Sequence, residues 1–452
     1  MAGSSSSGRR RIPSAMERIN QDAAGIDIGS ASHFVAVPED RDDQPVREFA
    51  AYTADLYRLA DWLAACGVRT VAMESTGVYW IPLFQVLEER GFEVRLVDAR
   101  RVKNVSGRKT DVADCQWLQQ LHTYGLLTSA FRPDDETCVL RSYMRQRDGL
   151  VLQAGQHIQH MQKALELMNV KLTEVLSDVT GTTGMAILDD ILAGKRDPKD
   201  LAKHRHPRCK HDEETMAKAL TGHYRAEHVF ALRQAVTLYR QCQVLIGECD
   251  AEIERFLEQH GPKDDGLVPP PPERPPRPSK NGLGFDAHAH LLRIAGVDLT
   301  AIPGLSTASV LTILAETGVD MRRWRSAKAF ASWLGLCPNN RISGGKRLSS
   351  RSQPCVNRAA RVFRLAAYGL HHAKSALGAY YRRMRTKLGA PKAITATAHK
   401  LARLFYSMLA TKRSFADIGQ DAYEHQYQAR RLAGLQRAAQ QLGFQLVPAP
   451  TP

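Results

Sequence analysis

Residues 24–38 read AGIDIGSASHFVAVP, a pattern typical of a strand, a Gly-Ser turn and a second strand. Downstream, TADLYRLADWLAACG at 53–67 predicts an amphipathic helix that ends at Gly67. A short buried strand follows in RTVAMES at 69–75, then a helix with a glycine stop in IPLFQVLEERG at 81–91 and a further strand in FEVRLVDA at 92–99. This alternation predicts a mixed sheet with helices packed on its faces.

A long helical region is predicted after this α/β segment. Two rows of mainly apolar residues recur at spacings of three and four, as in a heptad repeat. The first row is Leu140, Met144, Arg147, Val151, Ala154, Ile158, Met161, Leu165 and Met168, and the second is Val229, Leu232, Val236, Tyr239, Gln243, Ile246, Asp250, Ile253 and Leu257. The rows predict a coiled-coil hairpin or a dimerisation arm, with an ordinary helical bundle as the alternative. Gly149 and Gly155 weaken the first helix.

The remaining boundaries follow from composition. GPKDDGLVPPPPERPPRPSK at 261–280 is a proline-rich, semi-rigid linker. AIPGLSTASVLTILAETG at 301–318 has the Pro-Gly turn and following helix of a helix–hairpin–helix DNA clamp, in which a helix N-terminus binds phosphate. The predicted segments are a basic tail (1–20), an α/β domain (21–135), a helical coiled-coil region with an insert (136–260), the linker (261–284), a mostly helical domain (285–415) and a C-terminal helix with its tail (416–452).

The charge distribution indicates a polyanionic partner. The chain has 62 Lys and Arg against 47 Asp and Glu, a formal net charge of +15. Residues 321–416 contain 21 Lys and Arg and no acid. A solvated helical face usually mixes both signs, so this window predicts a surface that meets the phosphates of a nucleic acid, with a merely basic surface as the alternative.

The chain has no sign of a membrane or secreted protein. No run of about 18 apolar residues is present to span a bilayer, and the N-terminal residues lack the apolar core of a secretory signal. The 8 cysteines are scattered without a CxxC pair, which favours reduced thiols in a cytoplasmic protein. Residues 173–224 have no assigned role; His204, His206, Cys209 and His211 within them lack the paired spacing of a zinc site, so a basic loop facing nucleic acid is preferred.

Four carboxylates stand at positions that suit metal binding. Asp27 lies mid-strand between two isoleucines, where its burial needs a compensating partner. Glu74 ends the next strand, and Asp111 and Asp114, three apart in KTDVAD, share one face of a helical turn. Four neighbouring acids repel one another unless cations compensate, and a pair of magnesium ions suits such oxygen ligands. Glu74, Asp111 and Asp114 have an alternative interpretation, as residues that cap a helix N-terminus or lie on a helix surface.

The blocks GIDIGS (25–30), AMESTGVYW (72–80) and GRKTDVADCQWL (107–118) together resemble the DEDD transposases of the insertion-sequence family numbered one hundred and ten, which includes the Piv-type DNA invertases. The resemblance implies that the N-terminal domain is RuvC-like, a variant of the RNase H fold. It also implies that Asp27, Glu74, Asp111 and Asp114 bind magnesium and act in catalysis.

The second half resembles the C-terminal transposase domain of the same family through IPGLSTASVLTILAETG (302–318) and FASWLGLCPNNRISGGKRL (330–348). That domain is understood to supply a serine nucleophile, which falls on Ser343 in RISGGK. The rivals are Ser349, Ser350 and Ser352. Two glycines beside Ser343 allow the backbone to approach DNA closely. The predicted nucleic-acid contacts are Arg341, Lys346, Arg347, Arg351, Arg358, Arg361 and Arg364.

The function that the resemblance implies is a transposase or site-specific DNA recombinase of an insertion sequence, guided by a structured bridge RNA that pairs with donor and target DNA. It implies a phosphoserine intermediate, magnesium as cofactor, and a homotetramer built from dimers that brings two duplexes together. Two alternatives stay open: a RuvC-like nuclease or junction resolvase that uses water as the nucleophile, and a non-enzymatic nucleic-acid-binding protein. We expect the protein in the bacterial cytoplasm, on the nucleoid, without a membrane partner.

Overall fold

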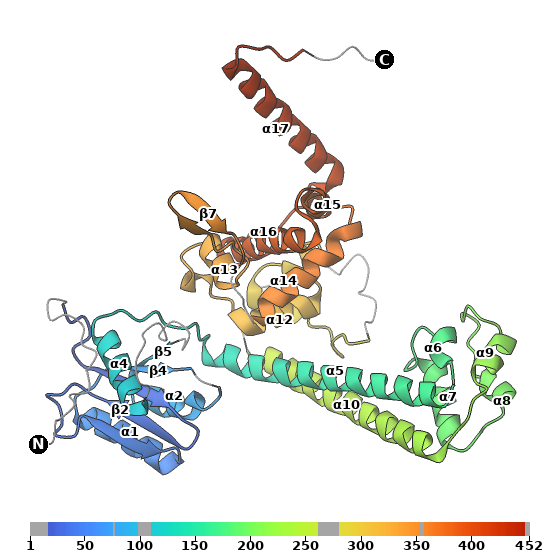
Figure 1. Cartoon of the computed structure of the whole chain (residues 1–452), viewed down its shortest axis with the longest axis horizontal. Coiled ribbons are helices and arrows are strands. Elements are labelled where there is room, and N and C mark those ends of the chain that lie inside the picture. Colours follow the sequence, from blue (N-terminus) through green and yellow to red (C-terminus); the bar gives the residue numbers. More distant parts are fainter. Residues whose placement is uncertain (1–16, 76, 98–109, 261–279, 353–356, 448–452) are drawn as a thin grey trace, which may run out of the picture. The chain divides into compact units, whose positions relative to one another are not determined.

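A computed structural model of the chain describes residues 17–75, 77–97, 110–260, 280–352 and 357–447. Most of the predicted basic tail, most of the proline-rich linker and the last five residues lie outside these ranges. The chain divides into two compact units, Met1–Arg132 and Pro133–Pro452, which are treated separately below (Figure 1).

The first unit contains a five-stranded mixed sheet. Its strands are β1 (Ala23–Ile28), β2 (Ser32–Ala36), β3 (Val46–Ala50), β4 (Thr70–Glu74) and β5 (Glu93–Val97), in the order β3-β2-β1-β4-β5. β4 pairs in parallel with β1 and β5, whereas β2 is antiparallel to β1 and β3. The predicted mixed α/β architecture is confirmed. The sequence pattern does not predict β3, because this short edge strand has no fully buried residue and therefore no strong apolar signal.

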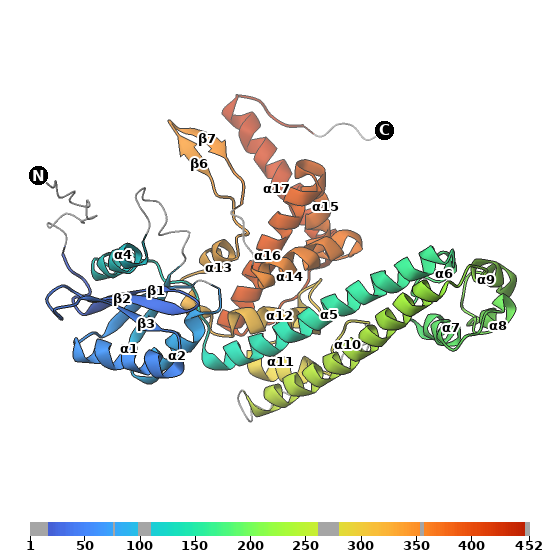
Figure 2. The same ribbon diagram turned by 60° about the horizontal axis from the view of Figure 1, so that its bottom comes forward.

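Helices cover both faces of this sheet. α1 (Thr53–Ala65) and α2 (Trp80–Glu89) pack on one face, and α4 (Asp111–Thr123) lies on the other (Figure 2). Isoleucine, leucine and methionine side chains of the sheet and the first two helices form the core on the α1/α2 face, among them Ile26, Leu59, Leu63, Met73, Leu83 and Leu87. The alternation of the strands therefore sends Ile26 and Met73 to this core and their neighbours to the α4 face.

The glycine stops end both helices as predicted. Gly67 and Gly91 have positive φ angles of 67° and 81°. After α1 the Gly67 N–H donates to the Ala64 carbonyl at 2.9 Å, and the next N–H reaches back to the Leu63 carbonyl at 3.0 Å. These two bonds satisfy helix carbonyls that would otherwise lack a donor, which is why glycine ends each helix.

The second unit begins with a long helical hairpin. α5 (Asp135–Leu167) and α10 (Ala226–Gln259) pack side by side and run antiparallel (Figures 1 and 2). The two predicted heptad rows form most of their contact, since the buried residues include Leu140, Met144, Ala154, Met161, Leu232, Val236, Ile253 and Leu257. The rows thus pair within one chain. α5 passes through Gly149 and Gly155 unbroken, because burial of its apolar row stabilises it more than two glycines weaken it.

The insert between the two long helices is a folded cap. It contains α6 (Leu172–Val175), α7 (Thr182–Leu192), α8 (Pro198–Ala202) and α9 (Glu213–Ala219), at one end of the hairpin (Figure 1). Leu188, Leu201 and Met216 from these helices are fully buried in one core with Met168 and Leu232. His204 bonds Asp190 at 2.7 Å. Within the described ranges, the histidines and cysteine of this segment do not gather into a metal-ligand cluster.

The rest of the second unit is mostly helical, as expected. Its elements are α11 (His288–Ala295), α12 (Thr307–Thr317), α13 (Ala327–Trp333), α14 (Arg358–Gly369), α15 (Ala376–Leu388), α16 (Ala390–Thr411) and α17 (Gly419–Gln441), with short 3-10 turns at Leu299–Ala301, Met321–Arg323 and Leu370–His372. A hairpin of β6 (Arg341–Ser343) and β7 (Lys346–Ser349) interrupts the helices. Among the described residues, no helix has the length and apolar character needed to cross a bilayer.

Candidate functional site

The predicted acids Asp27 and Glu74 lie on adjacent parallel strands. The register of β1 and β4 pairs Ile26 with Met73, so the next residues along the two strands, Asp27 and Glu74, stand beside each other. Both are half-buried. Because strand side chains alternate, these two acids point to the face opposite Ile26 and Met73, which is the face covered by α4.

Helix α4 crosses this face in the opposite direction to the strands. Near its end, His122 bonds the Thr70 hydroxyl at 2.9 Å, at the start of β4. Gly25 lies beneath its middle: a Cβ on Gly25 would stand 2.2 Å from the backbone nitrogen of Gln119 and 2.5 Å from the carbonyl oxygen of Cys115. Glycine at position 25 therefore permits the helix to lie directly on β1.

This crossing brings the first turn of α4 to the strand ends. Two residues along a strand cover about 6.6 Å, the same length as about four residues of helix. Because Gly25 lies against Cys115 and Gln119, Asp27 lies against the first turn of α4, where Asp111 and Asp114 are located. The Thr110 hydroxyl caps this turn by accepting a bond from the Ala113 N–H at 3.2 Å, so Thr110 rather than Asp111 is the N-cap residue.

The electrostatics of Cys115 relate Asp27 of β1 to Asp114 of α4. This thiol is fully buried. Burial, together with the charge of Asp27 and a smaller effect of Asp114, raises the pKa of Cys115 to about 12. The charges of Asp27 and Asp114 therefore act on the same buried sulfur, from the strand and from the helix.

The donor set at this edge suits a hard divalent cation. Asp27, Glu74 and Asp114 are half-buried and Asp111 is exposed, so all four offer carboxylate oxygens, the ligands that magnesium prefers. No three of them have ligand atoms that all lie within 4.8 Å of one another; among the described residues, Glu254, Glu258 and His290 do. The residue types and their position in the fold thus fit a metal site. The distances between the carboxylate oxygens are wider than those among three ligands of one ion.

Ser343 belongs to the second unit, on the β6–β7 hairpin. It pairs with Lys346 across a two-residue turn whose glycines, Gly344 and Gly345, have φ angles of 55° and 73°. Positive φ at both central residues matches the twist of a tight hairpin, which explains the glycine pair. Ser343 is exposed, and Ile342 and Leu348 on the same hairpin are 66% and 70% exposed. The hydroxyl is therefore accessible to a large substrate.

The predicted nucleic-acid contacts divide into two groups. Lys346, Arg347, Arg351 and Arg361 are exposed, and Arg341 lies in β6 with its side chain outside the described set. Arg358 instead pairs with Asp148 of α5 at 3.1 Å, and Arg364 donates to the Gly335 carbonyl at 3.3 Å. Of the three predicted contacts on α14, Arg358 and Arg364 thus have partners within the protein, and Arg361 is exposed.

Sequence reasoning missed a second cationic feature. α15, α16 and α17 line a cavity of about 350 Å³ that is open to solvent, and its lining includes Tyr380, Arg383, Lys400, Tyr423 and Arg430. The Lys400 ammonium stands 4.6 Å from the ring centre of Tyr380. Burial, and then Arg383, Arg430 and Arg403, lowers the pKa of Lys400. One nitrogen of Arg383, Nη1, is buried without a hydrogen-bond partner among the described residues. Arg383 and Lys400 belong to the acid-free window, but the packing of α15, α16 and α17 is what brings them together with Arg430, which lies outside it.

Comparison with protein families identifies the class. The model of the DEDD transposases of the IS110 family matches residues 24–170, the region of the sheet, α4 and α5. The model of the transposase IS116/IS110/IS902 family matches residues 296–382, which include the serine hairpin. The two matches lie in the expected order and together span about half of the chain. No curated protein matches this chain.

The chain belongs to the IS110 family of insertion-sequence transposases. It is a DNA transposase or recombinase, and its substrate is DNA. The DEDD type of the family indicates use of a divalent metal ion. The resemblance drawn from the three acidic blocks and the serine loop is thereby confirmed at the level of the family.

Proposed function

We propose that this transposase is a bridge-RNA-guided recombinase that cuts and rejoins DNA through Ser343. In this proposal the first unit is a RuvC-like domain whose acids bind magnesium. The observation that carries it is the placement of Asp27, Glu74 and the first turn of α4 at one edge of the sheet. An accessible serine on a two-glycine turn supports the nucleophile assignment.

The covalent step is a transesterification. The Ser343 oxygen forms a bond to the scissile phosphorus while the bond from phosphorus to the leaving strand's oxygen breaks. The serine proton passes to a base, and the leaving oxygen takes up a proton. Because one phosphoester replaces another, the reverse attack by a strand end rejoins DNA and frees the serine. When bound at the acids, magnesium supplies stabilisation of the charge that develops on the phosphoryl oxygens.

The partners in this proposal are two DNA duplexes and a structured RNA. Exposed cations on the hairpin, just after it and on α14 lie in the window that has no acid: Lys346, Arg347, Arg351 and Arg361. Phosphate contacts of this kind position a nucleic acid but carry no sequence information, which leaves sequence choice to base pairing with a guide. We further propose a homotetramer, acting on the nucleoid, as the assembly that holds both duplexes.

The chemistry is tested with purified protein, magnesium, labelled element-end DNA and element-derived RNA on a denaturing gel. We expect a slow, protease-sensitive DNA adduct with wild type, and none with Ser343→Ala or Asp27→Asn. Ser350→Ala is the matched control, because this exposed serine lies seven residues away in the same segment, and it should keep the adduct. Cleavage that persists in Ser343→Ala without an adduct would instead identify a nuclease that uses water.

The nucleic-acid surface is tested by the salt dependence of DNA binding. Lys346→Ala, Arg347→Ala and Arg361→Ala should each reduce the slope of log affinity against log salt by about 0.9, the value for one lost phosphate contact. Arg358→Ala should lower thermal stability instead, because Arg358 pairs with Asp148. Lys163→Ala, an exposed change on α5 outside the window, is the control. Equal slopes in wild type and all three variants would remove this surface from the proposal.

A further inference from the structure

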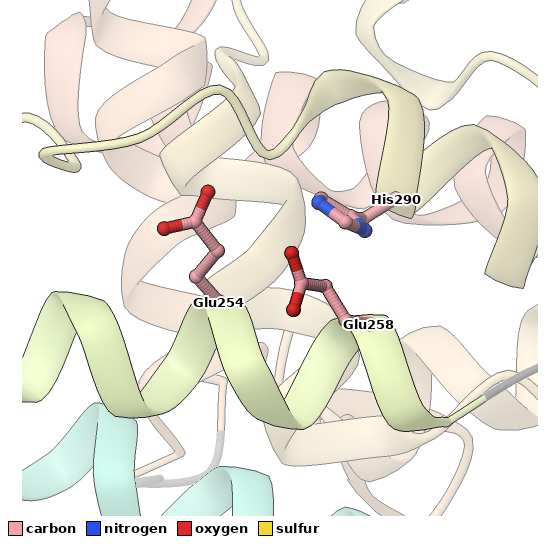
Figure 3. A group of neighbouring side chains, drawn as sticks. All are labelled: Glu254, Glu258 and His290. Carbon is pink, nitrogen blue, oxygen red and sulfur yellow. The ribbon is translucent and has the colours of Figure 1, made fainter.

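Two glutamates and a histidine outside the acidic edge lie together in the second unit. Glu254 and Glu258 are one turn apart near the end of α10, and His290 is on α11. Figure 3 shows both carboxylates on the side of α10 that faces His290. One ligand atom from each residue lies within 4.8 Å of the other two.

The two helices that carry these residues are held together independently of them. Arg293 of α11 donates to the Leu257 carbonyl of α10. Asp250 of α10 accepts a bond from the Gly284 N–H at 3.0 Å, just before α11. Leu257 and Leu291, next to the ligands in sequence, are buried. The fold thus brings the imidazole and both carboxylates together before any ligand binds.

No partner within the described part of the chain accounts for the convergence of the three side chains. Among the described residues, none of them forms a hydrogen bond or an ion pair with the protein. Two glutamates four apart on one helix repel each other when both are charged. A cation between them and His290 would remove this repulsion and use all three groups.

The ligand types select the kind of cation. Imidazole nitrogen with carboxylate oxygen suits zinc and the neighbouring transition metals, whereas magnesium and calcium prefer oxygen ligands alone. Ligands of one tetrahedral ion lie about 3.3 Å apart, given metal–ligand bonds of about 2.0 Å. Glu254 and His290 are only half-buried and Glu258 is exposed, so their side chains can rotate from separations of up to 4.8 Å to the shorter distances that one ion requires. A water molecule can serve as the fourth ligand.

We propose that Glu254, Glu258 and His290 bind a divalent transition-metal ion of the zinc class as a structural tie. The ion joins the end of α10 to α11 and so closes the intervening chain, residues 259–289, into a loop. Such a closure restricts the unfolded chain and stabilises the folded one. The site is separate from the acids of the first unit and does not depend on the proposed recombination chemistry.

The test uses the full-length protein in an Asp27→Asn, Glu74→Gln, Asp114→Asn background, so that the acidic edge does not bind the probe. Cobalt(II) is titrated as a spectroscopic substitute for zinc, and its visible absorption and the melting temperature are recorded. The parent should bind one equivalent and melt at a higher temperature with zinc. His290→Ala and Glu258→Gln should each weaken binding by more than about 100-fold, because each removes a direct ligand.

Matched controls separate ligand loss from general effects. Glu248→Gln changes an exposed acid of the same helix, and His425→Ala removes an exposed histidine of α17; both should bind cobalt as the parent does. Glu258 is exposed, so Glu258→Gln folds even if His290→Ala does not. Equal cobalt spectra in the parent and in Glu258→Gln and His290→Ala, or no absorption up to about 1 mM cobalt, would overturn the proposal.

Discussion

Two residues, Gly25 and His122, fix α4 on the sheet in different ways: the first through the absence of a side chain, the second through its ring. Gly25 must lack a side chain, because a Cβ would overlap the backbone of Gln119 and Cys115. His122 must keep its ring, because the ring fills a buried site and bonds Thr70. Both act on the position of Asp114 through the helix that carries it. Neither residue has a local sequence pattern that indicates this role.

His122 makes the stability of the first unit depend on pH. Burial, with a smaller effect of Arg95, lowers the pKa of His122 from 6.5 to about 4. Between these values the unfolded chain binds the proton and the folded chain does not, so stability falls as pH drops from 6.5 towards 4. We expect a loss of about 1–3 kcal/mol from this group across that range.

This dependence is measured by urea unfolding of wild type and His122→Gln at several pH values. The glutamine keeps a polar group near Thr70 but does not titrate, so its curve should be flatter. A residual slope is expected from His33, whose pKa is also lowered by burial. His425→Gln, an exposed change, should follow wild type. Identical slopes in wild type and His122→Gln would show that the folded state does not suppress protonation of this ring.

At the scale of elements, a buried ion pair joins the two helices of the α5–α10 hairpin. Arg147 and Asp250 are the charged members of the two apolar rows, and both are buried. The Arg147 Nε donates to the Asp250 carboxylate at 2.5 Å. Arg147 also donates to the carbonyls of Asn281 and Gly282. The two charged positions that interrupt the heptad pattern therefore bind each other. Arg147 also connects the chain that follows the linker to the α5–α10 hairpin.

Removing one partner of this ion pair should lower the free energy of unfolding of the second unit. Arg147→Met leaves the Asp250 carboxylate buried without its guanidinium and should destabilise the second unit by about 3–5 kcal/mol. Arg147→Met with Asp250→Leu should recover most of this loss, because no buried charge remains. The exposed pair Arg240–Asp189 is the control, and its removal should have little effect. If Arg147→Met unfolds at the same urea concentration as Arg240→Met, the pair does not stabilise the hairpin.

At the scale of the whole chain, the two units differ in charge. The acid-free window of residues 321–416 lies entirely in the second unit, and the predicted acidic site lies in the first. In the proposed recombination chemistry both are used, since the cations bind the nucleic acid and the carboxylates hold the metal. The division of charge along the sequence therefore follows the division of the chain into units.

The α5–α10 hairpin has exposed apolar side chains on α10. Ile158 and Ile246, members of the heptad rows, pack into the hairpin's own core, so changes there test folding rather than association. Phe230 and Val244 of α10 are 63% and 57% exposed. They are fourteen residues apart, close to four helical turns, and so lie on one face of α10.

The proposed assembly predicts a lower mass when this face becomes charged. Phe230→Asp with Val244→Asp should reduce the oligomer measured by light scattering while helical content stays unchanged, because a charge opposes burial between copies. Gln159→Asp adds a charge at an exposed site of α5 and should leave the mass as it is. A mass that does not change in the Phe230/Val244 variant would place the contact between copies elsewhere.

The sequence by itself determined the features that depend on local pattern. Strand alternation and the glycine stops predicted four of the five strands and the ends of α1 and α2, because backbone conformation there depends on nearby residues. Three acidic blocks and the serine loop were enough to identify the family. The metal role of the acids and the nucleophilic role of Ser343 stay predictions.

Only the tertiary structure decided which distant residues meet. It set Asp27 beside Glu74 and laid α4 on β1 at Gly25. It also paired Arg147 with Asp250, and it engaged Arg358 and Arg364 in contacts within the protein. It also brought Glu254 and Glu258 to His290 across the proline-rich segment. These contacts join residues about 30 to 200 positions apart, and such pairings depend on the packing of whole helices rather than on any periodicity within one segment.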